Sequence, residues 1–160
     1  IRAVHVSSVS SHKMLRRLAF LAAAAQLTLA DCPWGWTYFE DKCYKKTDHE
    51  GVFMEQLMTC MLSESGATIA SIHSQRENDF IRGLTSYEEI WAGGVAYIGE
   101  PWTWADKSDF YYGWKNWQGN REPAPDSHHP CIKMLESGEW EAVCCRCKPM
   151  YSVCSKKYEP

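Results

Sequence analysis

The spacing of apolar residues along the chain predicts two helices in its first half. In residues 51–65 apolar positions recur near helical spacing, which predicts one buried face made of Val52, Phe53, Leu57, Cys60 and Met61. In residues 74–84, Ser74 is followed three positions later by Glu77, the pattern of a capping box at the start of a helix. The apolar residues of that second helix, which follow the box, are Phe80, Ile81 and Leu84.

Short strands are expected around these helices. Residues 32–46, CPWGWTYFEDKCYKK, alternate aromatic and polar residues between turn-prone ends, and residues 68–72, TIASI, are rich in β-branched residues. Beyond Trp91 aromatic residues, glycine and proline dominate, which predicts long loops with strands near 131–135, 139–144 and 150–154. Two helices followed by strand-rich and loop-rich sequence predict an α+β fold.

The first 30 residues have a different sequence pattern from the α+β domain expected after them. Met14 opens MLRRLAFLAAAAQLTLADC, in which Arg16 and Arg17 precede an apolar run and the small residues before Asp31. This order predicts a secretory signal peptide over 14–30, with 1–13 as upstream sequence and one domain over 31–160. The apolar run is too short to span a bilayer comfortably and no second one follows, so a secreted product without a membrane span is expected.

The charge of the expected mature chain argues against a nucleic-acid partner. Four of the 17 basic residues precede residue 31, which leaves 13 against 20 acidic residues and a net charge of −7. A phosphate-binding surface needs clustered lysine and arginine, and the sequence has no such cluster.

All eight cysteines lie in the expected mature chain. An even number behind a signal peptide predicts disulfides, and an oxidising compartment disfavours a zinc site at Cys144, Cys145 and Cys147 because thiolate ligands must stay reduced.

Six landmarks in this order resemble the C-type lectin-like domain family. They are the N-terminal hairpin CPWGWTYFEDKCYK of the long form, the helical stretch ending in GATIASIHSQRENDFI, and the later segments WAGG, WTWADKSDFYYGW, EPA and CIKMLESGEWEAVC. The resemblance covers Cys32 to about Cys154 and is greatest to small secreted lectins of the fish and venom type. It implies two helices with short antiparallel sheets and a long loop region, all held by disulfides.

The resemblance also implies three disulfide pairs: Cys32–Cys43, Cys60–Cys154 and Cys131–Cys145. Cys144 and Cys147 depart from the family pattern. They either pair with each other or leave a thiol that links two chains in a homodimer, and a non-covalent homodimer is a further alternative.

In the family's calcium-dependent members, the ion sits in the long loop region and coordinates sugar hydroxyls. By resemblance Glu122 and Glu141 keep two ligand positions, whereas Ala124 and Ala142 lack side-chain oxygens and His129 replaces an acid. Calcium takes 6–8 oxygen ligands, so a degenerate site with weak or no calcium binding is expected.

Other residues of this loop leave alternatives open. Asp126 joins the ligand set if the loop is shifted, and His128 and His129 could bind zinc with Glu122 or Asp126. The resemblance further implies a cis peptide before Pro123.

The aromatic residues divide into two groups. The resemblance places six tryptophans in the core: Trp34, Trp36, Trp91, Trp102, Trp104 and Trp140. Four aromatics beside the loop form a candidate platform for a sugar ring or a protein partner: Tyr111, Tyr112, Trp114 and Trp117.

The resulting expectation is a secreted protein that binds a glycan or glycoprotein. The alternatives are calcium-independent protein binding and, disfavoured because no extra cysteine lies between Cys60 and Cys131, binding to ice or mineral. Catalysis is not expected, since hydrolase, metalloprotease and phosphate-loop motifs are lacking and every cysteine has a disulfide role.

Overall fold

The structure, a computed structural model, describes residues 32–97 and 99–159. The signal peptide expected at 14–30, the upstream residues 1–13 and Asp31 lie outside the described residues. These residues include two α-helices and a 3-10 turn: α2 (Phe53–Ser63), α3 (Gln75–Leu84) and η1 (Gln118–Asn120). The strands are β1 (Thr37–Phe39), β2 (Lys42–Lys46), β3 (Thr68–Ile69), β4 (Ile90–Val95), β5 (Thr103–Trp104), β6 (Cys131–Met134), β7 (Trp140–Val143) and β8 (Tyr151–Lys157).

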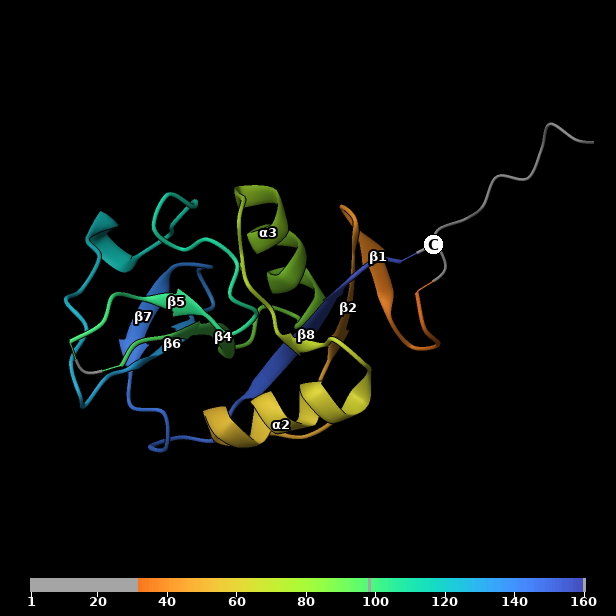
Figure 1. Cartoon of the computed structure of the whole chain (residues 1–160), viewed down its shortest axis with the longest axis horizontal. Coiled ribbons are helices and arrows are strands. Elements are labelled where there is room, and N and C mark those ends of the chain that lie inside the picture. The colour runs from red at the N-terminus through yellow and green to blue at the C-terminus, as the bar shows by residue number, and fades with distance from the viewer. Residues whose placement is uncertain (1–31, 98, 160) are drawn as a thin grey trace, which may run out of the picture.

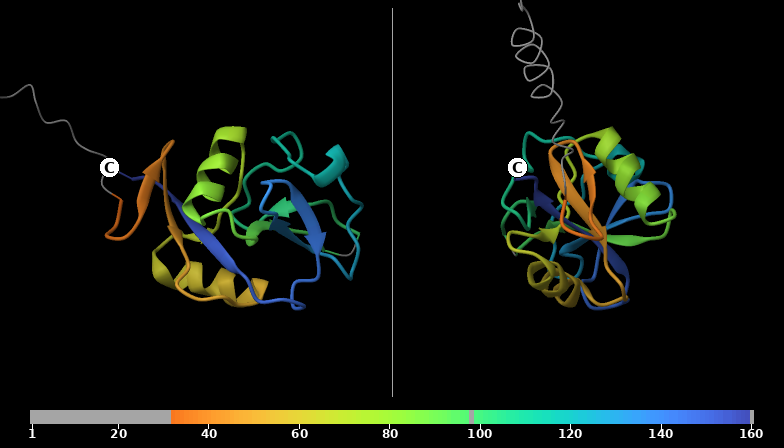
Figure 2. Two further views of the ribbon diagram at one scale, coloured as in Figure 1. Left: turned by 180° about the vertical axis from the view of Figure 1, so that it is seen from behind. Right: turned by 90° about the vertical axis from the view of Figure 1, so that its right-hand side faces the viewer.

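The strands form one sheet in the order β1-β2-β8-β4-β6-β7, with β3 added on β8 and β5 on β4. The α+β class is confirmed, and the strand pairs are antiparallel as expected except for β4 and β8, which pair in parallel. A parallel pair needs a long connection, and the chain between these strands supplies the long loop and the β6–β7 hairpin. The helices α3 and α2 lie on opposite sides of β8 (Figures 1 and 2).

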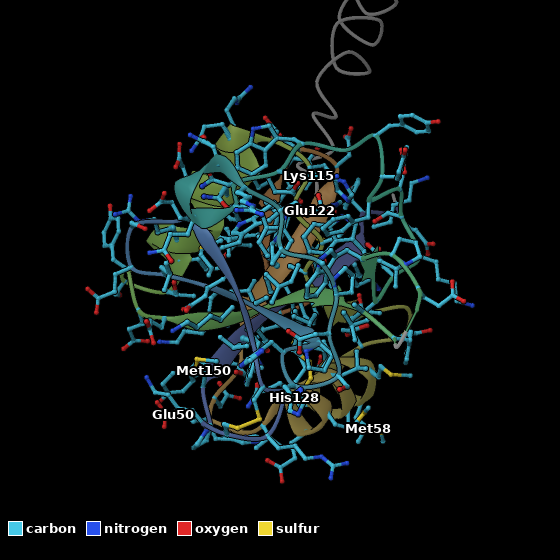
Figure 3. All side chains as sticks on the ribbon, turned by 90° about the vertical axis from the view of Figure 1, so that its left-hand side faces the viewer. Glu50, Met58, Lys115, Glu122, His128 and Met150 are labelled. Carbon is cyan, nitrogen blue, oxygen red and sulfur yellow. A yellow bond between two sulfur atoms is a disulfide. The ribbon has the colours of Figure 1, made fainter. Side chains whose placement is uncertain are left out.

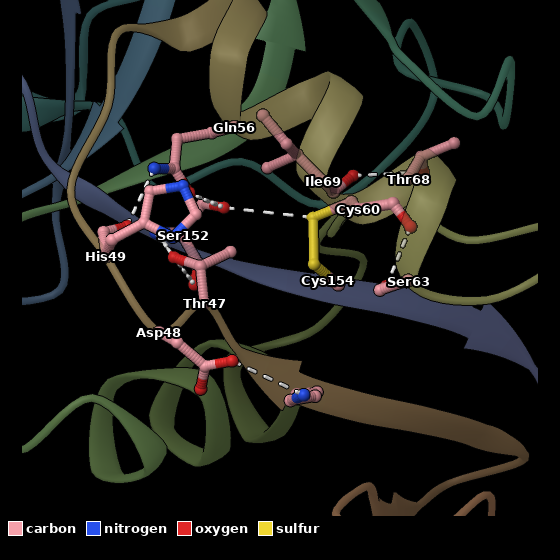
Figure 4. Close-up of a disulfide and its surroundings, with 11 residues drawn as sticks. Thr47, Asp48, His49, Gln56, Cys60, Ser63, Thr68, Ile69, Ser152 and Cys154 are labelled. Atoms are coloured by element: carbon pink, nitrogen blue, oxygen red, sulfur yellow. Dashed lines mark hydrogen bonds and ion pairs between the residues drawn. A yellow bond between two sulfur atoms is a disulfide. The ribbon is translucent and has the colours of Figure 1, made fainter.

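Strand β8 is tied to helix α2 by a disulfide and by buried hydrogen bonds (Figure 4). Cys60 of α2 bonds Cys154 of β8, and both are buried. Gln56 is fully buried one turn earlier, where its amide donates to the His49 carbonyl at 2.9 Å and its oxygen accepts from the Ser152 hydroxyl at 3.1 Å. These bonds explain a buried glutamine, since an unpaired buried amide would destabilise the fold.

Three of the four disulfides are the pairs that the family resemblance implies, and the fourth is one of the two alternatives left open for Cys144 and Cys147. The four pairs are Cys32–Cys43, Cys60–Cys154, Cys131–Cys145 and Cys144–Cys147. All eight cysteines therefore pair within one chain, and the covalent dimer that the sequence also allowed has no cysteine left to form it.

The start of α3 differs in detail from the expected capping box. The Ser74 hydroxyl accepts from the Glu77 backbone N–H at 3.0 Å, as predicted. The Glu77 carboxylate does not return to Ser74; it accepts from the His73 N–H at 2.7 Å and from Lys42 Nζ at 2.8 Å. Glu77 is buried, so this residue joins α3 to strand β2 as well as capping the helix.

Four of the six tryptophans expected in the core are buried, namely Trp91, Trp102, Trp104 and Trp140. Trp36 is partly buried, but Trp34 is 99% exposed, so its expected core position is wrong. The Trp36 N–H donates to the Pro33 carbonyl at 2.9 Å, and Gly35 has a φ of 82°. Trp34 therefore lies at the tip of a tight turn, where the side chain projects away from the protein.

The outer face of α2 carries an unexpected row of exposed apolar side chains. Met61 was expected in the buried face, but the buried residues of α2 are Phe53, Gln56 and Cys60. Met61 is 54% exposed, and Met54, Met58 and Leu62 are exposed beside it. The polar Gln56 occupies the inner face because it has hydrogen-bond partners there. Among the described residues, no helix is long and apolar enough to cross a membrane.

The disulfides are expected to differ in their contribution to stability. Cys60–Cys154 closes 94 residues and Cys144–Cys147 only 3. The chain-entropy relation gives about 4.5 kcal/mol for the first and about 2 kcal/mol for the second. Replacing Cys144 and Cys147 together with serine should lower the free energy of unfolding by the smaller amount in urea titrations. A loss as large as that from Cys60→Ser with Cys154→Ser would contradict this ranking.

A pH effect is expected from His73. Burial lowers the pKa of its imidazole below 6.5, assisted by the nearby Lys42 ammonium, and its Nε2 lies 3.0 Å from the Ser108 hydroxyl. Because the folded pKa is below the unfolded value, the neutral ring stabilises the fold above about pH 6.5, and this stability is lost as the pH falls below it. His73→Gln should therefore flatten the fall in melting temperature between pH 6.5 and 5. The matched change at the exposed His49, His49→Gln, should leave that fall unchanged.

Candidate functional site

The loop between β4 and β6 holds every predicted ligand residue except Glu141, and buried tryptophans anchor it. Trp102 donates its indole N–H to the Pro123 carbonyl at 2.9 Å. Trp117 pairs with Trp140 of β7 in an isolated bridge, and the Trp140 N–H donates to the Asn116 carbonyl at 2.7 Å. These contacts anchor Asn116 and Trp117 to β7, and Pro123 to Trp102.

The peptide before Pro123 is trans, so the expected cis turn is wrong for this structure. A trans peptide before proline is favoured by about 0.5–1 kcal/mol unless the surroundings enforce the cis form. Ala124 offers no side-chain oxygen that would need such a turn to reach an ion.

Glu122 is engaged by a lysine that the sequence did not single out. Lys115 Nζ lies 2.7 Å from Glu122 Oε2, and both residues are labelled side by side in Figure 3. The two side chains are 27% and 39% exposed, so the pair is partly shielded from water. The Lys115 ammonium thus provides a positive charge next to the carboxylate that the sequence suggested as a calcium ligand.

Lys115 also contacts two aromatic rings. Its Nζ lies 5.3 Å from the ring centroid of Phe110 and 5.9 Å from that of Tyr111. Both distances are within the range of cation–π attraction. The ammonium is therefore held between a carboxylate and two rings at the surface of the long loop.

Glu141 of β7 is likewise paired with a lysine. Lys133 Nζ lies 3.0 Å from Glu141 Oε2 and 3.1 Å from Glu89 Oε1, and Lys148 reaches the other oxygen of Glu89. Burial alone would lower the pKa of Lys133, but hydrogen bonds to Glu141 and Glu89 raise it above its usual value. The lysine is fully charged at neutral pH and neutralises the carboxylates it touches.

These residues do not fit a calcium ion. Glu122 and Glu141 face separate ammonium groups, and Ala124 and Ala142 supply no side-chain oxygens. Within 32–97 and 99–159, no three residues among His, Cys, Asp and Glu are grouped so as to hold a metal. An ion at this place would have to displace Lys115 and then take most of its ligands from backbone and water.

Asp126 is used inside the loop. Its Oδ1 accepts from the backbone N–H groups of His128 and His129 at 2.6 and 2.7 Å, and its Oδ2 lies 3.2 Å from His129 Nδ1. The hydrogen bond with His129 is the main reason why the pKa of Asp126 falls below its usual value. Asp126 therefore stabilises the turn at His128 and His129, and its carboxylate also contacts the His129 ring.

The four aromatics of the predicted platform separate into two exposed and two inward residues. Tyr111 and Tyr112 are 70% and 87% exposed, with their ring centroids 4.7 Å apart. Trp117 is only 4% exposed, so its expected role as a surface contact is wrong. Trp114 is partly buried and packs edge-on against Trp140 at 5.4 Å. Both indoles complete the core because the loop folds over β7.

The buried Trp117 has one unusual feature. Among the described residues, its indole N–H is the one buried side-chain polar atom without a hydrogen-bond partner. Its ring lies 5.2 Å from Trp102 and 6.0 Å from Trp140, so apolar packing holds it there at the expense of that donor.

Comparison with known proteins agrees with this architecture. Residues 53–156 match the model of the lectin C-type domain. The chain is 31% identical over 138 residues to the galactose-specific lectin nattectin of Thalassophryne nattereri, covering 79% of this chain and 81% of nattectin. It is 29% identical over 117 residues to the low affinity immunoglobulin epsilon Fc receptor of Mus musculus, covering 72% of this chain but only 34% of that receptor.

Solved structures show the same fold. A calcium-independent type II antifreeze protein superposes with a TM-score of 0.70 at 23% identity, covering 81% of this chain and 96% of that one. At that identity the similarity shows the fold alone. The match over residues 53–156 shows that the chain belongs to the lectin C-type domain family.

Proposed function

We propose that this protein is a secreted, non-catalytic lectin that binds a carbohydrate or glycoprotein surface without calcium. The observation that carries the proposal is the Lys115–Glu122 ion pair beside two exposed tyrosines. An ammonium, a carboxylate and two aromatic faces together offer hydrogen bonds to sugar hydroxyls and an apolar surface for a sugar ring. Nattectin, named as galactose-specific, supports a glycan as the ligand.

An extracellular location agrees with the disulfide content. Four disulfides persist in oxidising compartments and are rare in the cytosol. The signal-peptide pattern at 14–30 supports secretion independently of the structure.

Protein binding is a second candidate, favoured by the outer face of α2. Met54, Met58, Met61 and Leu62 are between 48% and 80% exposed on this one helix. Neighbouring exposed apolar side chains on a soluble domain often mark a protein contact. A non-covalent homodimer through this face would appear as a concentration-dependent mass in sedimentation, reduced by Met61→Glu.

Calcium is expected to have little effect on stability. An ion stabilises the folded state only when its concentration exceeds its dissociation constant, and here Lys115 competes for Glu122. The melting temperature should be equal in millimolar calcium and in excess chelator. The triple change Lys115→Gln, Ala124→Asn and Ala142→Asp should create a calcium-dependent rise, and Lys115→Gln alone should not. A large calcium-dependent rise in the parent, abolished by Glu122→Ala, would refute the proposal.

Glycan binding is expected to depend on the exposed tyrosines. Replacing Tyr111 and Tyr112 with alanine removes both aromatic faces and should weaken glycan binding about tenfold, with no change on adding chelator. The control is Tyr87→Ala, since Tyr87 is 56% exposed but lies after α3, outside the long loop. A glycan array with and without chelator identifies the sugar, and titration on it gives the affinities. Binding that vanishes in chelator, or that survives the double substitution unchanged, would contradict this site.

A further inference from the structure

A cavity of about 470 Å³ lies between the first turns of α2 and the end of the long loop. Its volume is within the range of small-molecule pockets. Phe53, Met54 and Leu57 of α2 line one side, with Val95 at the end of β4. The wall residues with charged or titratable side chains are Tyr97, His128 and Arg146. It is separate from the candidate glycan site, whose tyrosines do not line it.

The walls of this cavity are held in place by the backbone and by disulfides. The Phe53 N–H donates to the Cys145 carbonyl at 3.1 Å, and Cys145 is bonded to Cys131. Cys144 and Cys147 close the short segment that contains Arg146. The Ala96 N–H donates to the Pro130 carbonyl at 2.8 Å, which joins the end of β4 to the long loop. The cavity is therefore preformed, and binding would need little ordering of the chain.

Arg146 gives the rim of the cavity a positive charge. Arg146 is exposed and, within the described residues, forms no ion pair with a carboxylate. His128 lies beside the first turns of α2 in Figure 3, placed there by the turn that Asp126 stabilises. The Nδ1 atom of His128 lies 3.9 Å from Asp126 Oδ1, which is a weak contact. Within the described residues Arg146 has no such carboxylate partner. A guanidinium forms two parallel hydrogen bonds with a carboxylate, which makes a carboxylic acid its best-matched ligand.

We propose that this cavity binds a monocarboxylic acid with an unbranched apolar chain, of the fatty-acid class. The chain packs against Phe53, Leu57 and Val95, and the carboxylate pairs with Arg146 at the rim. Met54 is 61% exposed and, being unbranched and flexible, adapts to the part of the chain nearest the opening. The concave shape favours such a ligand over a protein surface, which would need a broad flat contact.

The test is titration calorimetry of the oxidised protein with octanoate, decanoate and dodecanoate below their micelle concentrations. Each buried methylene should strengthen binding about fourfold until the cavity is full. Arg146→Gln should weaken dodecanoate binding about tenfold or more and leave binding of the uncharged dodecanol unchanged. Arg121→Gln makes the same change of charge on the long loop away from the cavity and should have no effect.

A second pair of variants tests the apolar wall. Met54 and Met58 are both exposed on α2, but only Met54 lines the cavity, so both positions should tolerate glutamate without unfolding. Met54→Glu should abolish dodecanoate binding and Met58→Glu should not.

Several results would overturn the proposal: no dodecanoate binding, equal loss in both methionine variants, or binding indifferent to Arg146. Dissociation of a dimer by Met54→Glu without dodecanoate binding would make the cavity an interface between copies instead. Tyr111→Ala with Tyr112→Ala should leave dodecanoate binding unchanged, so failure of the glycan proposal would not affect this one.

Discussion

The hydrogen bond from the Trp140 indole to Asn78 Oδ1, at 2.9 Å, connects three parts of the fold. Trp140 belongs to β7, Asn78 to α3, and both are almost completely buried. The amide of Asn78 donates to the Gly138 carbonyl, which also accepts from Asn116 in the long loop. The rings of Trp104, Trp114 and Trp117 then pack against Trp140. Because the long loop has little regular structure, its position depends on this polar and aromatic centre.

Two carboxylates in and beside the long loop are balanced by charges of the chain itself. Lys115 neutralises Glu122 and Lys133 neutralises Glu141, the two carboxylates that the sequence suggested as calcium ligands. An ammonium on the chain is always present at its site, so the charge balance does not depend on the calcium concentration. An ion has open coordination positions for sugar hydroxyls, whereas an ammonium offers only its N–H donors. On the proposed function, aromatic and hydrogen-bonding contacts therefore replace ion coordination in binding a sugar at this surface.

The sequence predicted the framework better than the surface. The sequence predicted three of the four disulfides, the Ser74 cap of α3 and four buried tryptophans, either from local patterns or from the family resemblance. Lys115 and Glu122 form their ion pair across an irregular loop, and no periodic sequence pattern predicts such a contact. Pattern also failed to separate the buried Trp117 from the exposed Tyr111, since exposure there depends on how the loop folds over β7. The parallel pairing of β4 with β8 was missed because strand direction depends on the whole intervening chain.

The neighbouring cysteines 144 and 145 have a consequence for the biosynthesis of this protein. They belong to different disulfides, with Cys147 and Cys131 as their respective partners. Adjacent residues in an unfolded chain reach the same partners almost equally well, so Cys131 can first join the wrong neighbour. Correction requires exchange through a thiolate, which is slow without a catalyst. The correct isomer is selected only once the β6–β7 hairpin has its register, with Cys131 opposite Val143. Efficient production should therefore depend on a cell compartment that contains a disulfide isomerase.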